Sequence, residues 1–206
     1  MKTLLHIIAS PRGEQSNTLK IAQSVLARFR EQHPDGRIDT LDLFAEELPP
    51  MTLKATDGKY RLLSGKDLDD ETRPAWEPIL AHIERFKAAD IVLISSPMWN
   101  FGMPYVLKHY FDVIIQPRHL FRYTENGPEG LAKGKRVIVV TSRGGDYSEG
   151  PARAMDHLES SLRTMLGFIG ITDPIFIHAQ PMLGAGPEVA NQKLAQAVAA
   201  ARQVAL

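Results

Sequence analysis

Short apolar stretches alternate along the chain with segments whose apolar residues recur every three or four positions. Continuous apolar stretches are typical of strands buried on both faces, and the wider repeat is typical of the helices that cover them. The expected strands are Thr3–Ala9, Arg37–Leu43, Asp90–Ser96, Lys135–Thr141 and Ile171–His178. The expected helices are Thr18–Arg30, Ala75–Ala88, a helix opened by Pro104 at its first turn, Ala154–Leu166 closed by Gly167, and Glu188–Leu206. The alternation predicts one α/β domain, residues 1–206, with a doubly wound five-stranded parallel sheet and helices on both faces.

Two segments do not follow this pattern. Leu48–Asp70 is polar and contains two prolines and two glycines, so we expect it to be irregular. Gln116–Gly134 is longer than the usual connection between elements and contains the turn signal Asn126-Gly127-Pro128. Because Leu120, Phe121 and Tyr123 are apolar or aromatic, this stretch is expected to cover something rather than to be disordered.

Composition and charge narrow the function classes. The 24 basic residues balance the 24 acidic ones, so no broad field exists that would attract nucleic acid or an anionic membrane. The chain has no cysteine, which excludes disulfides, iron–sulfur clusters and cysteine nucleophiles. No apolar run approaches the roughly 20 residues of a membrane helix, and the N-terminus lacks a signal-peptide pattern. We therefore expect a cytoplasmic protein. The histidines show no ligand spacing, so we expect no metal site.

Ligands of doubly wound sheets bind outside the carboxyl ends of the strands, so the loops there carry the chemistry. The first such loop is Ser10–Thr18, at the start of a helix, where free N–H groups favour a phosphate. Its candidate ligands are hydroxyls, an amide and a guanidinium: Ser10, Ser16, Thr18, Asn17 and Arg12. The alternative is that Ser16 or Asn17 only caps the helix. Since Gly13 stands alone, the loop lacks a dinucleotide fingerprint and suits a monophosphate.

The second loop, Ser95–Pro104, holds bulky apolar residues, Met98, Trp99 and Phe101, where solvent would reach them unless they cover a flat ligand. The alternative is that this loop packs into the core or into a subunit interface. The third loop, Thr141–Tyr147, contains Gly144-Gly145, which lets backbone amides approach the edge of a ring. The alternative is that this loop is an ordinary turn, and its position after a strand favours the ligand-binding interpretation.

Five motifs taken together resemble the FMN-dependent NADH-azoreductases, which are flavodoxin-like NAD(P)H:quinone oxidoreductases. They are Ser10-Pro-Arg-Gly-x-x-Ser16, Pro97-Met-Trp-Asn-Phe101, Phe121-Arg-Tyr-Thr-Glu-Asn-Gly-Pro-Glu-Gly130, Thr141-Ser-Arg-Gly-Gly145 and Leu166-Gly-Phe-Ile-Gly-Ile171. The resemblance covers essentially the whole chain in order. Two features depart from it: many relatives have Tyr where this chain has Trp99, and Ala45–Asp70 matches poorly.

The resemblance implies a flavodoxin-like homodimer with one FMN per subunit, which reduces quinones and azo compounds with NADH or NADPH. It assigns the FMN phosphate to Ser10, Ser16, Asn17 and Thr18. It assigns the isoalloxazine to Met98, Trp99, Asn100, Phe101, Ser142, Arg143, Gly144 and Gly145. By the same analogy Phe121 forms a wall of the substrate pocket over the partner's flavin; the alternative is ordinary core filling.

The cofactor would carry the chemistry in a ping-pong cycle, so no side chain is assigned a certain catalytic role. His119 is the nearest candidate for donating a proton to product, although solvent can do the same. A flavodoxin-type electron carrier without its own NADH oxidation is the alternative function, and a flavin-free interaction protein is a third.

Overall fold

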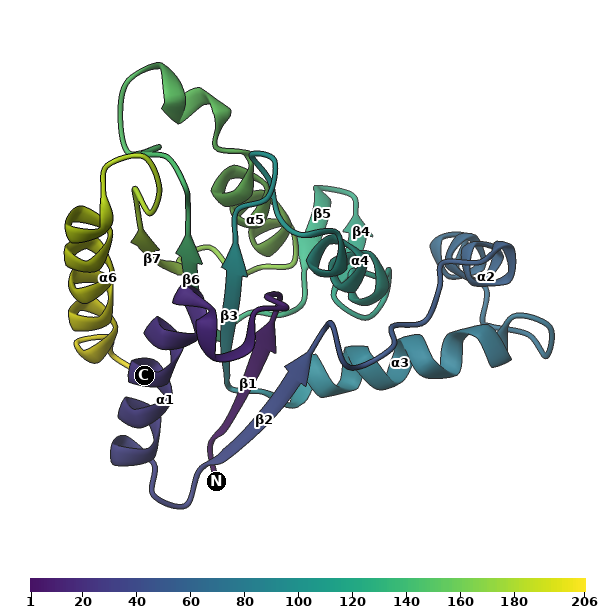
Figure 1. Ribbon diagram of the computed structural model, residues 1–206. Helices are drawn as coiled ribbons and strands as arrows, with labels where there is room; N and C mark the ends of the chain where they lie inside the picture. Colours follow the sequence, from purple (N-terminus) through teal and green to yellow (C-terminus); the bar gives the residue numbers. More distant parts are fainter.

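The computed structural model describes all 206 residues, and its centre is a five-stranded parallel sheet (Figure 1). The strand order is β2-β1-β3-β6-β7, so β2 lies on one side of β1, and β3, β6 and β7 follow in order on the other side. The strands are β1 Thr3–Ile8, β2 Arg37–Asp42, β3 Ile91–Pro97, β6 Arg136–Ser142 and β7 Ile175–Ala179. This arrangement confirms the predicted sheet, and β7 begins four residues later than the apolar pattern suggested.

Helices cover both faces because successive strand residues point to opposite sides. Leu5 and Ile7 of β1 belong to the larger apolar core, whereas Leu4 belongs to the smaller one. The larger core is covered by α3 Arg73–Ala88, α4 Tyr105–Ile114 and α5 His157–Phe168. The smaller core is covered by α1 Asn17–Gln32 and α6 Pro187–Arg202, which lie side by side (Figure 1). None of the helices combines the length and the apolar character needed to cross a membrane.

The segment expected to be irregular contains a helix, α2 Leu53–Leu63, so that expectation was wrong. Thr52 caps it, since its hydroxyl accepts a hydrogen bond from the Ala55 N–H at 3.3 Å. Gly58 is buried against Trp76, and a Cβ at position 58 would lie 2.1 Å from the Trp76 indole nitrogen. The glycine is therefore required for close packing of α2 on α3 rather than for a turn. Figure 1 shows α2 beside the end of α3 that is remote from the sheet.

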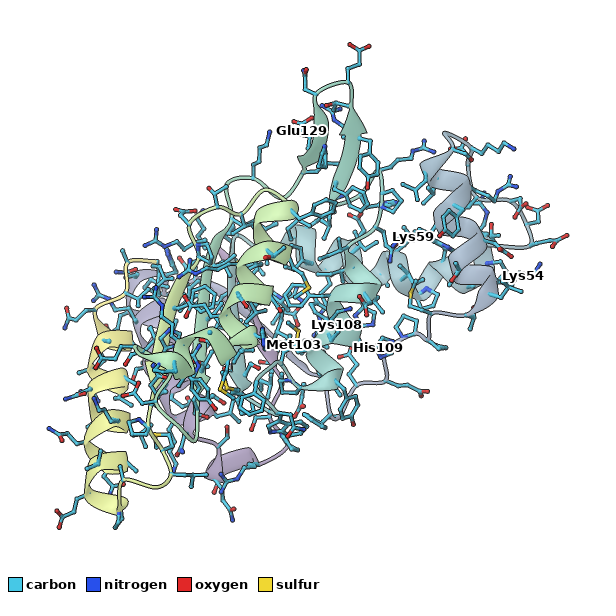
Figure 2. The ribbon with its side chains drawn as sticks, turned by 90° about the horizontal axis from the view of Figure 1, so that it is seen from above. Lys54, Lys59, Met103, Lys108, His109 and Glu129 are labelled. Atoms are coloured by element: carbon cyan, nitrogen blue, oxygen red, sulfur yellow. The ribbon has the colours of Figure 1, made fainter.

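The long excursion after α4 contains a two-stranded antiparallel hairpin, which the sequence analysis did not resolve. Its strands are β4 Phe121–Thr124 and β5 Gly127–Gly130, and Gly127 at φ +102° makes the turn. Figure 2 shows the hairpin, marked by Glu129, projecting from the rest of the molecule. Its base is fixed because Gly130 packs directly on the backbone of Ile169 and Gly170, where any Cβ would clash.

The helix boundaries show smaller differences. Pro104 is the N-cap of α4 rather than a first-turn residue. The residues before α5 form a short 3-10 helix, η2 Pro151–Met155, and a second one, η1 Gly13–Gln15, precedes α1. α5 continues past Gly167 to Phe168, and Gly170 at φ +97° adopts the left-handed conformation that follows it.

Candidate functional site

The loops that follow β1, β3, β6 and β7 meet at one edge of the sheet, because the carboxyl ends of parallel strands share that edge (Figure 1). They enclose a cavity of about 260 Å³. Most residues that the resemblance assigns to FMN line it: Ser10, Ser16, Asn17, Met98, Trp99, Ser142, Arg143 and Gly144. The topology thus brings together residues from three sequence-distant loops.

The loop after β1 supplies hydroxyl groups at the start of α1. Ser10 and Ser16 are both buried and both line the cavity. The Ser16 hydroxyl caps α1 only weakly, since the Leu19 N–H lies 3.4 Å away, and it also pairs with the Thr18 hydroxyl at 2.9 Å. Thr18 is fully buried and does not line the cavity, so in this chain it supports Ser16.

This donor set fits a phosphate group. Asn17 is the first residue of a 16-residue helix, whose free N–H groups and dipole favour an anion. Arg12 also lines the cavity and adds a positive charge. Hydroxyls, an amide, a guanidinium and a helix N-terminus together suit a monophosphate held without a glycine-rich fingerprint.

The loop after β3 makes a tight turn that presents two aromatic side chains. Trp99 and Gly102 exchange both backbone hydrogen bonds at 2.9 Å, and the residues between them, Asn100 and Phe101, have φ of +46° and +68°. Asn tolerates this left-handed region, but a bulky Phe is held there only under strain. Trp99 and Phe101 remain 37% and 43% exposed, so the turn displays apolar surface instead of burying it.

Other elements hold this turn in place. The His157 N–H, at the start of α5, donates to the Phe101 carbonyl at 2.9 Å. The ring of Phe44 packs against Trp99, with ring centroids 5.9 Å apart, and also against Tyr105. The strained turn is therefore supported from both sides, as expected for a conformation that function requires.

A second cavity of about 800 Å³ adjoins the first, and Trp99 lines both. Asn100 lines this second cavity rather than the first, together with Met103, Tyr105 and Met165. Its walls mix aromatic and thioether side chains with hydroxyls from α5, which is a suitable surface for a flat organic molecule.

The loop after β6 offers free backbone donors. The N–H groups of Gly144 and Gly145 have no hydrogen-bond partner within the chain. The carbonyl of Ser142 accepts from the Met98 N–H at 2.9 Å, which ties this loop to the one after β3. Gly145 does not line the cavity, although Gly144 does. Two adjacent unpaired N–H groups suit the polar edge of a heteroaromatic ring.

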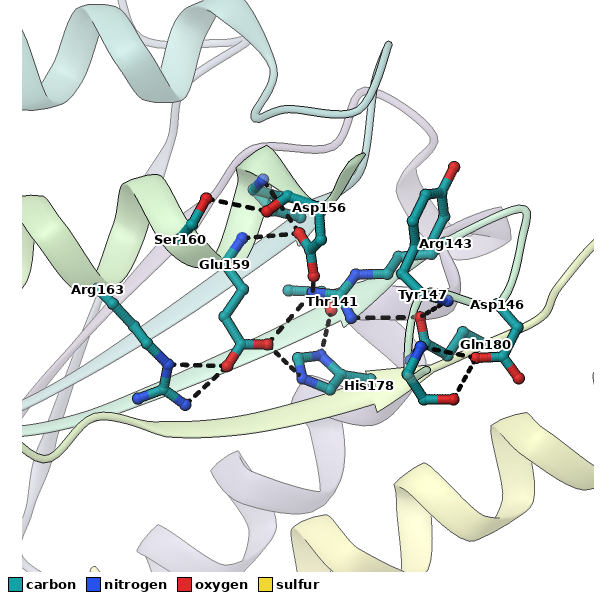
Figure 3. A network of polar contacts seen from close by, with 12 residues as sticks. Thr141, Arg143, Asp146, Tyr147, Asp156, Glu159, Ser160, Arg163, His178 and Gln180 are labelled. Carbon is teal, nitrogen blue, oxygen red and sulfur yellow. Dashed lines mark hydrogen bonds and ion pairs between the residues drawn. The ribbon is translucent and has the colours of Figure 1, made fainter. Parts of the chain in front are cut away.

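Arg143 lines the cavity, and its guanidinium lies in a polar network (Figure 3). That group is 1% exposed, lies 2.9 Å from an Asp156 carboxylate oxygen and donates to the Gln180 amide oxygen at 3.2 Å. The same oxygen accepts from the Tyr147 N–H. The Arg143 guanidinium therefore ties the cavity-lining loop to Asp156 and Gln180.

Glu159 connects this network to β7. Its carboxylate lies 2.9 Å from His178 Nε2 and 2.7 Å from Arg163, and the His178 Nδ1 pairs with the Thr141 hydroxyl at 2.8 Å (Figure 3). The hydrogen bond with His178, aided by Arg163, lowers the pKa of Glu159 to about 2. Glu159 thus stays ionised at neutral pH, and its network links β6, α5 and β7.

Phe121 and His119 lie outside both cavities. Phe121 is 5% exposed and its ring centroid is 4.7 Å from that of Phe168, so within one chain it is packed as a core residue. His119 lies beside Trp76, where burial lowers its pKa.

Two residues not expected from the sequence, Met182 and Leu183, line the first cavity from the loop after β7. This loop contains Gly184-Ala-Gly186, a pattern typical of an ordinary turn. The available signal was its position, since it follows a strand that ends at the ligand-binding edge of the sheet.

Comparisons with known proteins show which family the chain belongs to. The family model described as flavodoxin-like fold matches residues 2–205. The FMN-dependent NADH:quinone oxidoreductase of Nitratidesulfovibrio vulgaris is 40% identical over 100% of this chain and 99% of its own length. A relative from Pseudomonas syringae pv. tomato, FMN-dependent NADH:quinone oxidoreductase 2, is 39% identical, over 98% of this chain and 97% of its own.

Solved structures of azoreductases from Bacillus anthracis are similar over the whole chain. One, from strain Sterne, has a TM-score of 0.86 at 30% identity and covers 99% of this chain and 100% of its own. Another, an FMN-dependent NADH-azoreductase solved in complex with FMN, has a TM-score of 0.86 at 27% identity with full coverage of both chains. The chain therefore belongs to the flavodoxin-like family of FMN-dependent NADH:quinone oxidoreductases and azoreductases.

Proposed function

We propose that this chain is an FMN-dependent oxidoreductase that takes hydride from NADH or NADPH and reduces quinones and azo compounds by a ping-pong mechanism. The observation that carries the proposal is the meeting of three complementary surfaces in one cavity. These are the hydroxyl-rich start of α1, Trp99 of the turn after β3 and Gly144, with its free N–H group, after β6. The relatives named above share the donor and the cofactor.

The residues present fit FMN. Ser10, Ser16 and Asn17 would hold its phosphate, with Thr18 positioning the Ser16 hydroxyl. Met98 to Phe101 would support the ring, and Gly144 and Gly145 would donate hydrogen bonds to its polar edge. When bound, FMN supplies the two-electron chemistry that links NADH oxidation to reduction of the acceptor.

The protein's own part in the reaction is to bind, to orient and to set the electrostatic field. Free N–H groups at Gly144 and Gly145 stabilise negative charge that develops nearby, and they need no reorganisation because the Arg143 network fixes their loop. The adjoining cavity, lined by Tyr105 and Met165, gives the donor and then the acceptor a place to bind. Successive use of one space by both substrates is the basis of the ping-pong proposal.

We also propose that the chain forms a homodimer. Trp99, Phe101 and Tyr105 leave apolar surface exposed around the larger cavity, and Tyr105 is 70% exposed. A second copy that covers this surface would close the cavity and exclude water. NADH is a donor of the cell interior, and we propose a cytoplasmic location on that ground.

The test is spectroscopic and kinetic. The purified protein is expected to be yellow, to release FMN rather than FAD on denaturation, and to lose its flavin absorbance when NADH alone is added without oxygen. Double-reciprocal plots with NADH and a benzoquinone are expected to be parallel. Intersecting plots would contradict the ping-pong cycle. A protein that contains FMN but keeps its flavin absorbance when NADH is added would favour the flavodoxin-type electron carrier.

A further inference from the structure

Leu183 is a large aliphatic residue that stays 75% exposed at the rim of the cavity to which we assign FMN. It lies in the connection between β7 and α6, one strand beyond the three loops whose motifs predicted the site. Single exposed leucines are common on protein surfaces, so exposure alone carries no conclusion. Its backbone anchoring and its contact with Gly144 distinguish it from other exposed leucines.

The backbone around Leu183 is fixed to the loop after β6. The Leu183 N–H donates to the Gly144 carbonyl at 2.9 Å, and the Met182 N–H donates to the Arg143 carbonyl at 2.9 Å. Gln180, three residues earlier, accepts from the Arg143 guanidinium and from the Tyr147 N–H. Leu183 is therefore held at a defined position over that loop.

The Leu183 side chain lies against Gly144 itself. A Cβ added to Gly144 would be 3.2 Å from Leu183 Cδ1 and would meet no other group as closely. Gly144 lines the cavity and has a free N–H group. A ring whose edge bonds to this N–H would come next to the Leu183 methyl groups.

We propose that Leu183 is an FMN-binding residue, whose side chain packs against the isoalloxazine beside Gly144 and is covered by it. The proposal rests on the placement of FMN proposed above and extends the site from three loops to four. It also accounts for the network around Arg143, which holds the loops after β6 and β7 together as one wall.

Dilution of the holoenzyme with detection of released FMN by its fluorescence measures the dissociation constant and tests this inference. Loss of part of a leucine's burial predicts that Leu183→Ala raises the FMN dissociation constant about tenfold. Leu183→Met, which keeps an apolar side chain of similar volume, is expected to bind FMN nearly as the wild type does. The matched control is Leu53→Ala on α2, a leucine that is 76% exposed and lines neither cavity.

The possible results distinguish a failure of the proposed Leu183 contact from a failure of the proposed function. A raised dissociation constant in Leu183→Ala, with Leu53→Ala and Leu183→Met unchanged, supports FMN contact. An unchanged constant in Leu183→Ala overturns this inference while the proposed function stands. An equal rise in Leu53→Ala would show a general effect of removing exposed leucines and also overturns it. A wild-type protein that binds no FMN would defeat the proposed function together with the inference.

Discussion

The guanidinium of Arg143 and the carboxylate of Asp156 form a nearly buried ion pair, with 2.9 Å between Nη2 and Oδ2. Asp156 also caps α5, because its other oxygen accepts from the N–H groups of Leu158 and Glu159 at 3.1 and 3.0 Å. One carboxylate therefore fixes both the cavity-lining loop after β6 and the start of the helix that lines the larger cavity.

Asp156→Ala is expected to destabilise the protein by about 3 kcal/mol, because it removes the closer carboxylate partner of a buried guanidinium and the helix cap, leaving Arg143 only Glu159 at 3.6 Å. Urea unfolding measures the loss. The matched control is Asp112→Ala, whose exposed pair with Lys108 is of the i,i+4 type and is expected to contribute under about 0.5 kcal/mol. Equal losses in the two variants would show that the buried pair has no special role.

His6 makes stability depend on pH. It is buried in β1, its Nε2 pairs with the Ser95 hydroxyl at 2.8 Å, and burial lowers its pKa to about 4. The unfolded chain takes up a proton near pH 6.5, whereas the folded chain resists protonation until about pH 4. The contribution of His6 to the free energy of unfolding is therefore fully present above pH 6.5. It falls as the pH drops, by about 3 kcal/mol at pH 4.

The measurement is urea unfolding at several pH values from 7 to 4, on the wild type and on His6→Gln. Gln can bond to Ser95 but does not titrate in this range, so the difference in unfolding free energy between the two proteins should shrink as the pH falls. Carboxylates with lowered pKa, such as Glu159, affect both proteins equally. A difference that is constant across the range would contradict the assignment to His6.

The strain at Phe101 is open to a direct test with two substitutions. Both Phe101→Ala and Phe101→Gly remove the ring, but only Gly adopts φ +68° without cost. Phe101→Gly is expected to be more stable than Phe101→Ala by about 1 kcal/mol, after allowing for the greater freedom of Gly in the unfolded chain. Equal unfolding free energies would mean that the turn carries no backbone strain.

Much of the fold could be predicted because the spacing of apolar residues indicates which strands are buried and which face of each helix is buried. Helix α2 could not be predicted in this way, and Gly58 shows the reason. In the sequence a glycine in a polar stretch favours a turn, but here the absent side chain makes room for the Trp76 indole. That reason lies in a residue 18 positions away and becomes visible only when α2 and α3 are placed together.

The site shows the same division. The loops after β1, β3 and β6 carry unusual compositions, so their residues could be predicted to meet at one edge of the sheet. Leu183 carries no motif, and its place at the cavity follows only from hydrogen bonds between the loops after β6 and β7. Arg143 could be assigned to the correct loop, but its motif could not reveal that its side chain turns toward Asp156.

Variants at Phe121 distinguish its role in packing from a role in substrate binding. Its burial against Phe168 predicts that Phe121→Ala lowers the unfolding free energy by about 3–5 kcal/mol. Tyr123→Ala removes a 65% exposed side chain on the same strand whose ring meets Phe121 edge-on, and should cost only about 0.5–1.5 kcal/mol. Phe121→Leu keeps most of the volume and loses the aromatic face. If Phe121 also forms the wall over the flavin of a second subunit, the Leu variant should raise the KM for benzoquinones with its FMN content unchanged, since stacking contributes about 0.5–1.5 kcal/mol. Unfolding free energy, flavin content and quinone kinetics measured on the three variants resolve the question. A Leu variant with the wild-type KM would restrict Phe121 to the core beneath the hairpin.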